Sequence, residues 1–489
     1  MEYLYGLLFG TEPKQSDADA SHTLRTKLEA LPGDRDAQIT LTAAEIRILK
    51  EATTTTRQKH GGGDELFVRM HSNLTEDLDP STADAVVDAY GASPLKPNPL
   101  AKRRPSPETP QLRKACKNAV ADLISERQLA SSVPKERRKT LEAALSEVNA
   151  WGFDVWSVVD AFQGDTLLAS RAIVDAVVFE ARGFRAASAS PILRQVVSKM
   201  LASYQDVPYH NCLHGADVLQ AMHALLNLAP TFDDALDDDV VLVTLLACLS
   251  HDVGHPGLTN NFLVETGHEL AIRYNDASPL ENMHAAVALN LAKPYLRTRP
   301  STDQKQNRAL WIGLLLATDM KEHSQQIFEL ERALSKAKER GTSYEACTPE
   351  HHVPCLKIFI HACDISNPAK PWPVYRRWTA LVMEEFWRQA ELERERGLPL
   401  TVPARDATDL AQFQKGFIAF IRPLFAAADR IGGVDMSLPL ERLDDTARRW
   451  QSGSPRAEAY DPPVATEPPP VSFQTLTEPV ALGDDDVRE

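Results

Sequence analysis

The spacing of apolar residues along the chain defines a central segment that differs from both ends. From about residue 112 to about residue 450, apolar residues recur three and four positions apart, as in Ile173–Ala181 and Leu193–Leu201, which predicts amphipathic helices. Strand-like alternation is nearly absent. Helix-breaking residues are frequent: we expect one helix to run from Asn211 to Pro230, and another to end at Gly397. The pattern therefore predicts an all-α domain.

The two ends of the chain have a different composition. The N-terminal part contains runs such as Thr53–Thr56 and Gly61–Gly63, and the C-terminal part is rich in proline and ends in acidic residues. Such segments bury too little apolar surface to offset the entropy lost on ordering. We therefore predict a largely disordered regulatory region at 1–110, a compact multi-helix domain at 111–450 and a disordered acidic, Pro-rich tail at 451–489.

Charge and composition narrow the functional class. The net charge of −15 argues against a broad nucleic-acid-binding surface, and no apolar run reaches the roughly 18 residues needed to span a membrane. Met1–Gly10 is apolar but contains Glu2 and no basic residue, so we interpret it as a packing or peripheral anchoring segment rather than a signal peptide. Six scattered cysteines without C-x-x-C spacing favour the reducing cytoplasm.

Histidines concentrate in the helical segment, where eleven of the 14 lie between His210 and His361. The first group is Y-H-N-C-L-H-G-A-D-V, in which His210 and His214 are four residues apart and Asp217 follows three residues later. Asn211 is suited to cap this helix, and the two imidazoles would share one face. On its own, the pair is also compatible with two polar residues that face solvent.

A second group follows a segment that is apolar on every side. L-S-H-D-V-G-H-P-G places His251 and Asp252 at the end of this expected buried helix, with His255 three residues later. A buried carboxylate must be paired or bound to a cation. The alternative is a helix end that reaches the surface, which would leave His255 and the adjacent His-Asp pair without a role.

A third group, Ile358–Trp372, again carries a histidine and an aspartate, His361 and Asp364, on an apolar helix that breaks at Asn367. Three such groups predict a site where imidazoles and carboxylates from separate helices converge. These ligands suit zinc together with magnesium or manganese. Two cations about 3.5–4 Å apart are typical of phosphate-ester hydrolysis.

At this point the motifs resemble a known family. Taken in order, they are similar to the catalytic domain of class I 3′,5′-cyclic-nucleotide phosphodiesterases, over roughly residues 145 to 430. The segments that carry the resemblance are W-G-F-D-V-W, Y-H-N-x-L-H-x-A-D-V, H-D-V-x-H-P-G-x-T-N-N-F, E-L-A-I-R-Y-N-D-x-S-P-L-E-N, A-T-D-M and D-I-S-N-P-x-K-P-W.

The resemblance implies the catalytic roles. It implies two divalent ions, Zn²⁺ and Mg²⁺ or Mn²⁺, with Asp252 bridging them; the implied metal ligands are His214, His251, Asp252 and Asp364. It implies that His210 is the general acid that protonates the O3′ leaving group while a hydroxide attacks phosphorus. The residues expected to surround the ligands are His255, Glu281, Thr318 and Asp319, and Glu281 would orient the acid and the waters.

The resemblance also implies a binding site for the cyclic nucleotide. F-Q-K-G-F-I is similar to the family segment in which a glutamine, here Gln414, binds the purine edge, and Phe417 would stack on the base. Taken alone, Phe417 would be an ordinary core aromatic. Tyr209 and Asn367 are also expected at the substrate, and Asn367 within S-N-P resembles members that prefer adenine.

Three positions depart from the family pattern: Gly254, where an acidic residue is usual, Met283, where a histidine is usual, and Phe413 in place of serine. None is an implied metal ligand. The leading interpretation is hydrolysis of cyclic nucleotides, cAMP in preference to cGMP, to 5′-monophosphates, which ends cyclic-nucleotide signalling. Gly254 and Met283 motivate an alternative, a catalytically weakened cyclic-nucleotide-binding regulatory protein. A third interpretation, a metal phosphohydrolase with another substrate, is disfavoured by Gln414 with Phe417.

Regulation and assembly are less determined by the sequence. A-K-R-R-P-S has the pattern that basophilic kinases favour, so Ser106 is a candidate phosphorylation site, although so short a motif is also an ordinary solvated basic run. The sequence leaves open whether the chain forms a homodimer and whether Met1–Gly10 contacts a membrane.

Overall fold

The computed structural model describes residues 135–184 and 191–451. These residues are helical throughout, with no strand; their only β-type pairing is an isolated bridge between Glu345 and Gly432. The all-α prediction is therefore confirmed for the part of the chain that is described. The predicted disordered regions at both ends, the Met1–Gly10 segment and the Ser106 motif lie outside the described residues and stay predictions.

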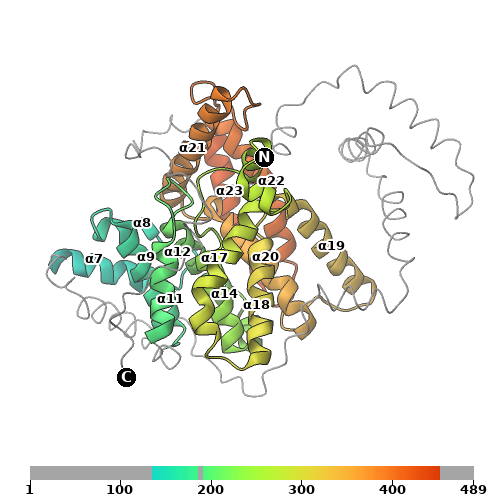
Figure 1. Ribbon diagram of the computed structural model, residues 1–489. Coiled ribbons are helices and arrows are strands. Elements are labelled where there is room, and N and C mark those ends of the chain that lie inside the picture. Colours follow the sequence, from blue (N-terminus) through green and yellow to red (C-terminus); the bar gives the residue numbers. More distant parts are fainter. Residues whose placement is uncertain (1–134, 185–190, 452–489) are drawn as a thin grey trace, which may run out of the picture. The chain divides into compact units, whose positions relative to one another are not determined.

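The helices are joined by turns and loops (Figure 1). The first part of the chain forms α7 (Lys135–Ser146), α8 (Val155–Ala161), α9 (Thr166–Val174), the π-helix η2 (Asp175–Ala181) and α11 (Pro191–Ala202). The middle part forms α12 (Cys212–Leu228), α13 (Pro230–Ala235), α14 (Asp238–Ser250), α15 (Asn260–Glu265), α16 (Glu269–Arg273), α17 (Pro279–Leu296) and α18 (Ser301–Leu316). The last part forms the 3₁₀-helices η3 (Met320–Glu322), η4 (Pro349–His351) and η5 (Asn367–Ala369), and the α-helices α19 (His323–Glu339), α20 (His352–Asp364), α21 (Trp372–Glu395), α22 (Leu410–Ala428) and α23 (Ser437–Gln451).

Three central helices hold the core together. Helix α12 packs against α9, α14 and α20, and α14 also packs against α17, α18 and α20 (Figure 1). Every residue of α14 from Val240 to Ser250 is buried, which agrees with the segment being apolar on all sides and surrounded by other helices. The first turn of α12, the turn that directly follows α14 and the last turn of α20 carry the predicted metal ligands.

The local signals that end helices behave largely as predicted. The side chain of Asn211 caps α12 by accepting a hydrogen bond from the amide of Leu213 at 2.9 Å, and α12 ends at Leu228, two residues before Pro230. Helix α21 ends at Glu395, and Gly397 follows it with φ 67°, a left-handed conformation that suits glycine.

One predicted helix differs in kind. The segment Ile173–Ala181 was expected to be a regular helix, but α9 ends at Val174 and the chain continues as the π-helix η2, which closes with a bond from the amide of Arg182 to the carbonyl of Val177 at 2.9 Å. The residues from Asp175 to Phe179 are all buried. Apolar residues three and four positions apart are compatible with both the wider turn of a π-helix and an α-helix. The sequence pattern therefore could not predict the π-helix.

Two further observations concern membrane-spanning helices and disulfide bonds. Within the described ranges, no helix is both long and apolar enough to cross a bilayer. The five cysteines in these ranges are all free thiols.

Candidate metal centre and active site

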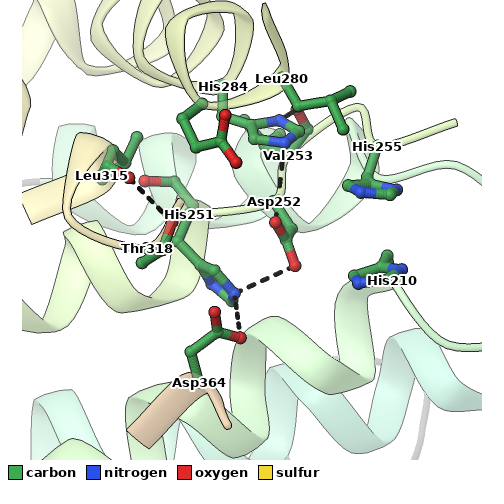
Figure 2. A network of polar contacts seen from close by, with 12 residues as sticks. His210, His251, Asp252, Val253, His255, Leu280, His284, Leu315, Thr318 and Asp364 are labelled. Carbon is green, nitrogen blue, oxygen red and sulfur yellow. Dashed lines mark hydrogen bonds and ion pairs between the residues drawn. The ribbon is translucent and has the colours of Figure 1, made fainter. Parts of the chain in front are cut away.

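Four predicted ligands converge at one point between the central helices. His214 lies in the first turn of α12, His251 and Asp252 directly follow α14, and Asp364 is the last residue of α20. One ligand atom from each of the four lies within 4.8 Å of the others. Figure 2 shows His251 between the carboxylates of Asp252 and Asp364. Residues that are up to 150 positions apart in sequence thus form one buried group.

The distances within this group fit a divalent cation. The Nε2 atoms of His214 and His251 each lie 3.1 Å from Oδ1 of Asp364, and Nε2 of His251 lies 3.0 Å from Oδ2 of Asp252. Ligands held at about 2.0–2.2 Å around a tetrahedral zinc ion would be about 3.3–3.6 Å apart. The four side chains therefore need only small shifts to hold a cation between them.

The tautomer of His251 also suits metal binding. Its Nδ1 atom donates a hydrogen bond to the backbone carbonyl of Cys248 at 2.8 Å, which leaves Nε2 facing the two carboxylates. A backbone carbonyl in this role is the usual way in which proteins orient a metal-binding imidazole.

The charges in this group balance one another. Burial alone would lower the pKa of His251, but Asp252 and Asp364 outweigh it and raise that pKa well above its usual value. Burial alone would raise the pKa of each aspartate, but the neighbouring histidines hold the pKa of both carboxyl groups below the usual range. A proton on His251 thus occupies the place that the positive charge of a cation would take, so metal binding should displace it.

A second group of possible ligands adjoins Asp252. His284, on α17, donates from Nδ1 to the carbonyl of Val253 at 2.9 Å, and its Nε2 lies 3.6 Å from Oδ1 of Asp252 (Figure 2). Burial lowers the pKa of His284 to about 4, so Nε2 is a lone-pair acceptor that faces a carboxylate, with no hydrogen-bond partner among the described residues. Two acceptors facing each other favour a cation nearby, and His255 completes the group.

His210 lies beside the metal group but is held by a different helix. Its Nδ1 atom lies 2.6 Å from Oε2 of Glu385 on α21, and the other oxygen of Glu385 accepts the backbone amides of Tyr209 and His210 at 2.6 and 2.8 Å. The ring of His255 stacks on His210 with centroids 3.9 Å apart. Burial alone would lower the pKa of His210, but Glu385 outweighs it and raises the pKa to about 9.

The residues expected around the ligands have the following contacts. Glu281 accepts hydrogen bonds from Asn260 at 2.9 and 3.1 Å, so the carboxylate that contacts His210 belongs to Glu385 rather than to Glu281. Burial, with Asp319 and Asp252, raises the pKa of Glu281 to about 8.

Thr318 and Asp319 follow α18. The hydroxyl of Thr318 donates to the carbonyl of Leu315 at 2.8 Å (Figure 2). The carboxylate of Asp319 accepts from the hydroxyl of Ser278 at 2.7 Å and from the amide of Lys321, which caps η3. These contacts fix the chain around the metal group, and a direct role at bound waters stays a prediction.

The residues predicted to bind the nucleotide divide into two pairs. The amide of Asn367 donates to the hydroxyl of Tyr209, and the ring of Tyr209 lies 4.6 Å from that of His214, so this pair adjoins the metal group. Gln414 and Phe417 lie one turn apart on α22; Gln414 is buried and its side-chain oxygen accepts from the hydroxyl of Tyr375 at 2.7 Å. Phe417 is half-buried and packs against the core.

Two of the departures from the family pattern leave the metal group intact. Gly254 has φ 80°, so it occupies a left-handed turn between Asp252 and His255 where residues with a side chain are disfavoured. Met283 is fully buried in the hydrophobic core. The structure therefore explains why glycine and methionine are accommodated at these positions.

Comparisons with known proteins agree with the fold and identify relatives of the chain. The family model of the 3′5′-cyclic nucleotide phosphodiesterases matches residues 209–437, a range that contains all four residues of the metal group. The chain is 32% identical to the rat (Rattus norvegicus) 3′,5′-cyclic-AMP phosphodiesterase 4C over 382 residues, which cover 75% of this chain and 68% of the rat protein.

Two further relatives match over shorter ranges. The mouse (Mus musculus) 3′,5′-cyclic-AMP phosphodiesterase 4C is 33% identical over 335 residues, 66% of this chain and 48% of the mouse protein. A probable 3′,5′-cyclic-AMP phosphodiesterase of Caenorhabditis elegans is 35% identical over 259 residues, 52% of this chain and 38% of the worm protein.

An all-α domain that gathers two imidazoles and two carboxylates in its core is consistent with a metal-dependent phosphohydrolase. The chain belongs to the 3′,5′-cyclic nucleotide phosphodiesterase family, and the resemblance seen in the sequence is confirmed.

Proposed function

We propose that this phosphodiesterase hydrolyses 3′,5′-cyclic AMP, in preference to cyclic GMP, to the nucleoside 5′-monophosphate at a centre that holds Zn²⁺ and Mg²⁺ or Mn²⁺. The observation that carries the proposal is the convergence of His214, His251, Asp252 and Asp364 within 4.8 Å. The preference for cAMP is supported by the names of the three relatives, which are all cyclic-AMP phosphodiesterases.

The protein side chains have distinct parts in this proposal. Bound divalent cations polarise phosphate oxygens and lower the pKa of water, so that a nucleophile forms at neutral pH. Asp252 would help to hold both cations, because its Oδ2 lies 3.0 Å from Nε2 of His251 and its Oδ1 lies 3.6 Å from Nε2 of His284. His284 and His255 are thus proposed to surround the second cation, beside the four residues of the metal group.

His210 is proposed to donate the proton that the leaving group needs. As the bond between phosphorus and O3′ breaks, the electron pair goes to O3′, which takes a proton from Nε2 of His210. Glu385 holds the opposite ring atom at 2.6 Å, and the raised pKa of about 9 keeps the imidazole protonated at neutral pH. The acid is therefore charged and oriented before the substrate arrives.

Replacing Glu385 with glutamine tests this arrangement. Because a carboxylate at hydrogen-bond distance raises the pKa of a histidine by about 1–3 units, Glu385→Gln should move the alkaline limb of the pH–kcat profile at least about one unit lower. At pH 8 the variant should be slower because less His210 carries a proton. The measurement is kcat from pH 6 to 10 at saturating substrate.

A matched control is available one residue earlier on α21. Glu384 pairs with Arg388 and Arg405 and has no contact with His210 in the described structure, so Glu384→Gln should keep the alkaline limb of the unsubstituted enzyme. An alkaline limb that stays in place in Glu385→Gln would show that the carboxylate does not set the protonation of the acid.

The proposed function is tested by assaying cAMP and cGMP hydrolysis side by side, before and after treatment with a chelator and after adding back Zn²⁺ with Mg²⁺ or Mn²⁺. We expect faster hydrolysis of cAMP, loss of activity on chelation and recovery on metal addition. Binding of cAMP without turnover would support the alternative, a catalytically weakened regulatory protein. Turnover confined to other phosphate esters would contradict both.

A further inference from the structure

We propose that the hydroxyl of Tyr204 is a positioning group that sets the metal-binding turn after α14 against the first turn of α12; this rests on the proposed metal-dependent function. Tyr204 lies in the connection between α11 and α12, five residues before Tyr209 and outside the motifs that predict the site. Its hydroxyl donates a hydrogen bond to the carbonyl of Leu249 at 2.7 Å.

The carbonyl that accepts this hydrogen bond lies at the end of α14, two residues before His251 and three before Asp252. One hydroxyl thus joins the connection that precedes α12 to the last turn of the helix that leads into two of the predicted metal ligands.

The end of α14 explains why this bond matters. The final carbonyls of a helix have no partner within the helix and must be satisfied elsewhere. The carbonyl of Cys248 accepts from Nδ1 of His251, and that of Ser250 accepts from the amide of Val253 at 3.3 Å. Between them, the carbonyl of Leu249 is satisfied by Tyr204, which comes from a different segment of the chain. The turn that carries two metal ligands is therefore fixed from outside.

Gly215 brings a second metal-binding element to the same place. It follows His214 in α12, and a Cβ atom added to it would lie 2.8 Å from the carbonyl oxygen of Leu249 and 2.9 Å from Cζ of Tyr204. Real Cβ atoms do not approach a backbone oxygen so closely, so the space beside α12 is filled by the Tyr204–Leu249 hydrogen bond. Tyr204 thus lies between the two elements that carry His214, His251 and Asp252.

The first test replaces Tyr204 with phenylalanine in the full chain. Tyr295→Phe is the matched control, because Tyr295 is a buried tyrosine whose hydroxyl has no hydrogen-bond partner in the described ranges. Affinity for Zn²⁺ and for Mn²⁺ is measured by competition with a chromophoric chelator, alongside thermal unfolding with and without metal. Substitution of a group that orients a metal ligand typically lowers metal affinity by about 10–100-fold. We therefore expect Tyr204→Phe to bind metal at least about 10-fold more weakly and Tyr295→Phe to match the unsubstituted chain.

The outcomes separate a positioning role from a purely structural one. If Tyr204→Phe lowers the unfolding temperature but binds both metals as tightly as the unsubstituted chain, the hydroxyl serves stability alone and the proposal is overturned. If the unsubstituted chain binds neither metal, the proposed function fails, and this inference fails with it.

Gly215→Ala provides a second test that keeps every hydrogen-bonding group, in case Tyr204→Phe does not fold. The added methyl group must push α12 away from the Tyr204–Leu249 bond, so metal affinity should again fall. Its control is Gly313→Ala in α18, where the new Cβ atom would meet only the flexible end of Lys357 at 3.3 Å. Unchanged metal affinity in Gly215→Ala would contradict the proposal.

Discussion

Asp364→Ala should lose its bound metal and almost all activity. Oxygen Oδ1 of Asp364 lies 3.1 Å from both His214 and His251, so the substitution removes the donor that both imidazoles share. Because metal ions supply several kcal/mol of transition-state stabilisation, kcat/KM should fall by about three to four orders of magnitude. Metal content by elemental analysis and kcat/KM for cAMP are the measurements.

The control for this variant is Asp175→Ala. Asp175 is a buried aspartate that pairs with Arg171 and Arg194 on the first helices, away from the metal group. Its removal should lower the unfolding temperature but leave the metal content per folded chain unchanged. A folded Asp364→Ala variant that retained a full complement of metal would refute the assignment of this residue.

His210→Ala should behave in the opposite way, keeping its metal while turning over slowly. The imidazole is held by Glu385 and contributes no atom to the group of His214, His251, Asp252 and Asp364. Loss of a general acid typically costs about 10²–10⁴-fold in rate, so kcat for cAMP should fall by that factor. The metal content should equal that of the unsubstituted enzyme.

The leaving group makes this prediction specific. A phosphodiester with an acidic leaving group, such as bis(4-nitrophenyl) phosphate, needs little protonation as the ester bond breaks. The penalty of His210→Ala should therefore be much smaller with this substrate than with cAMP. An equal penalty for both substrates would mean that His210 serves another purpose, such as binding the phosphate.

The convergence of the predicted metal ligands could be anticipated because several of them are marked by their immediate surroundings. His251 with Asp252, and Asp364, end helices that are otherwise apolar, and buried charges of this kind demand a partner. The structure brings them together with His214 as the resemblance implied. The fold class was predictable for a different reason: apolar residues recur at helical spacing through the described part of the chain.

The local sequence carries no comparable signal for the residues that are proposed to orient His210 and the metal ligands. Glu385 is one of many charged residues on α21 and lies 175 positions from His210, so nothing in the local sequence links them. His284 follows Met283 in the segment L-E-N-M-H, where the family resemblance is a signal that could have identified it. The hydroxyl of Tyr204 donates a hydrogen bond to the backbone of α14, a contact that depends on tertiary packing rather than on sequence spacing.

The proposed proton donor and the proposed cation site are held by separate elements: Glu385 on α21 holds His210, while α12, the turn after α14 and α20 carry the metal group. A substitution of His210 alone should therefore slow hydrolysis while the binding site for the cyclic nucleotide is retained. Such a chain would still bind the cyclic nucleotide and would release most of it unchanged. In a cell it would buffer the concentration of the cyclic nucleotide instead of lowering it by hydrolysis. A single substitution would thus separate binding from turnover.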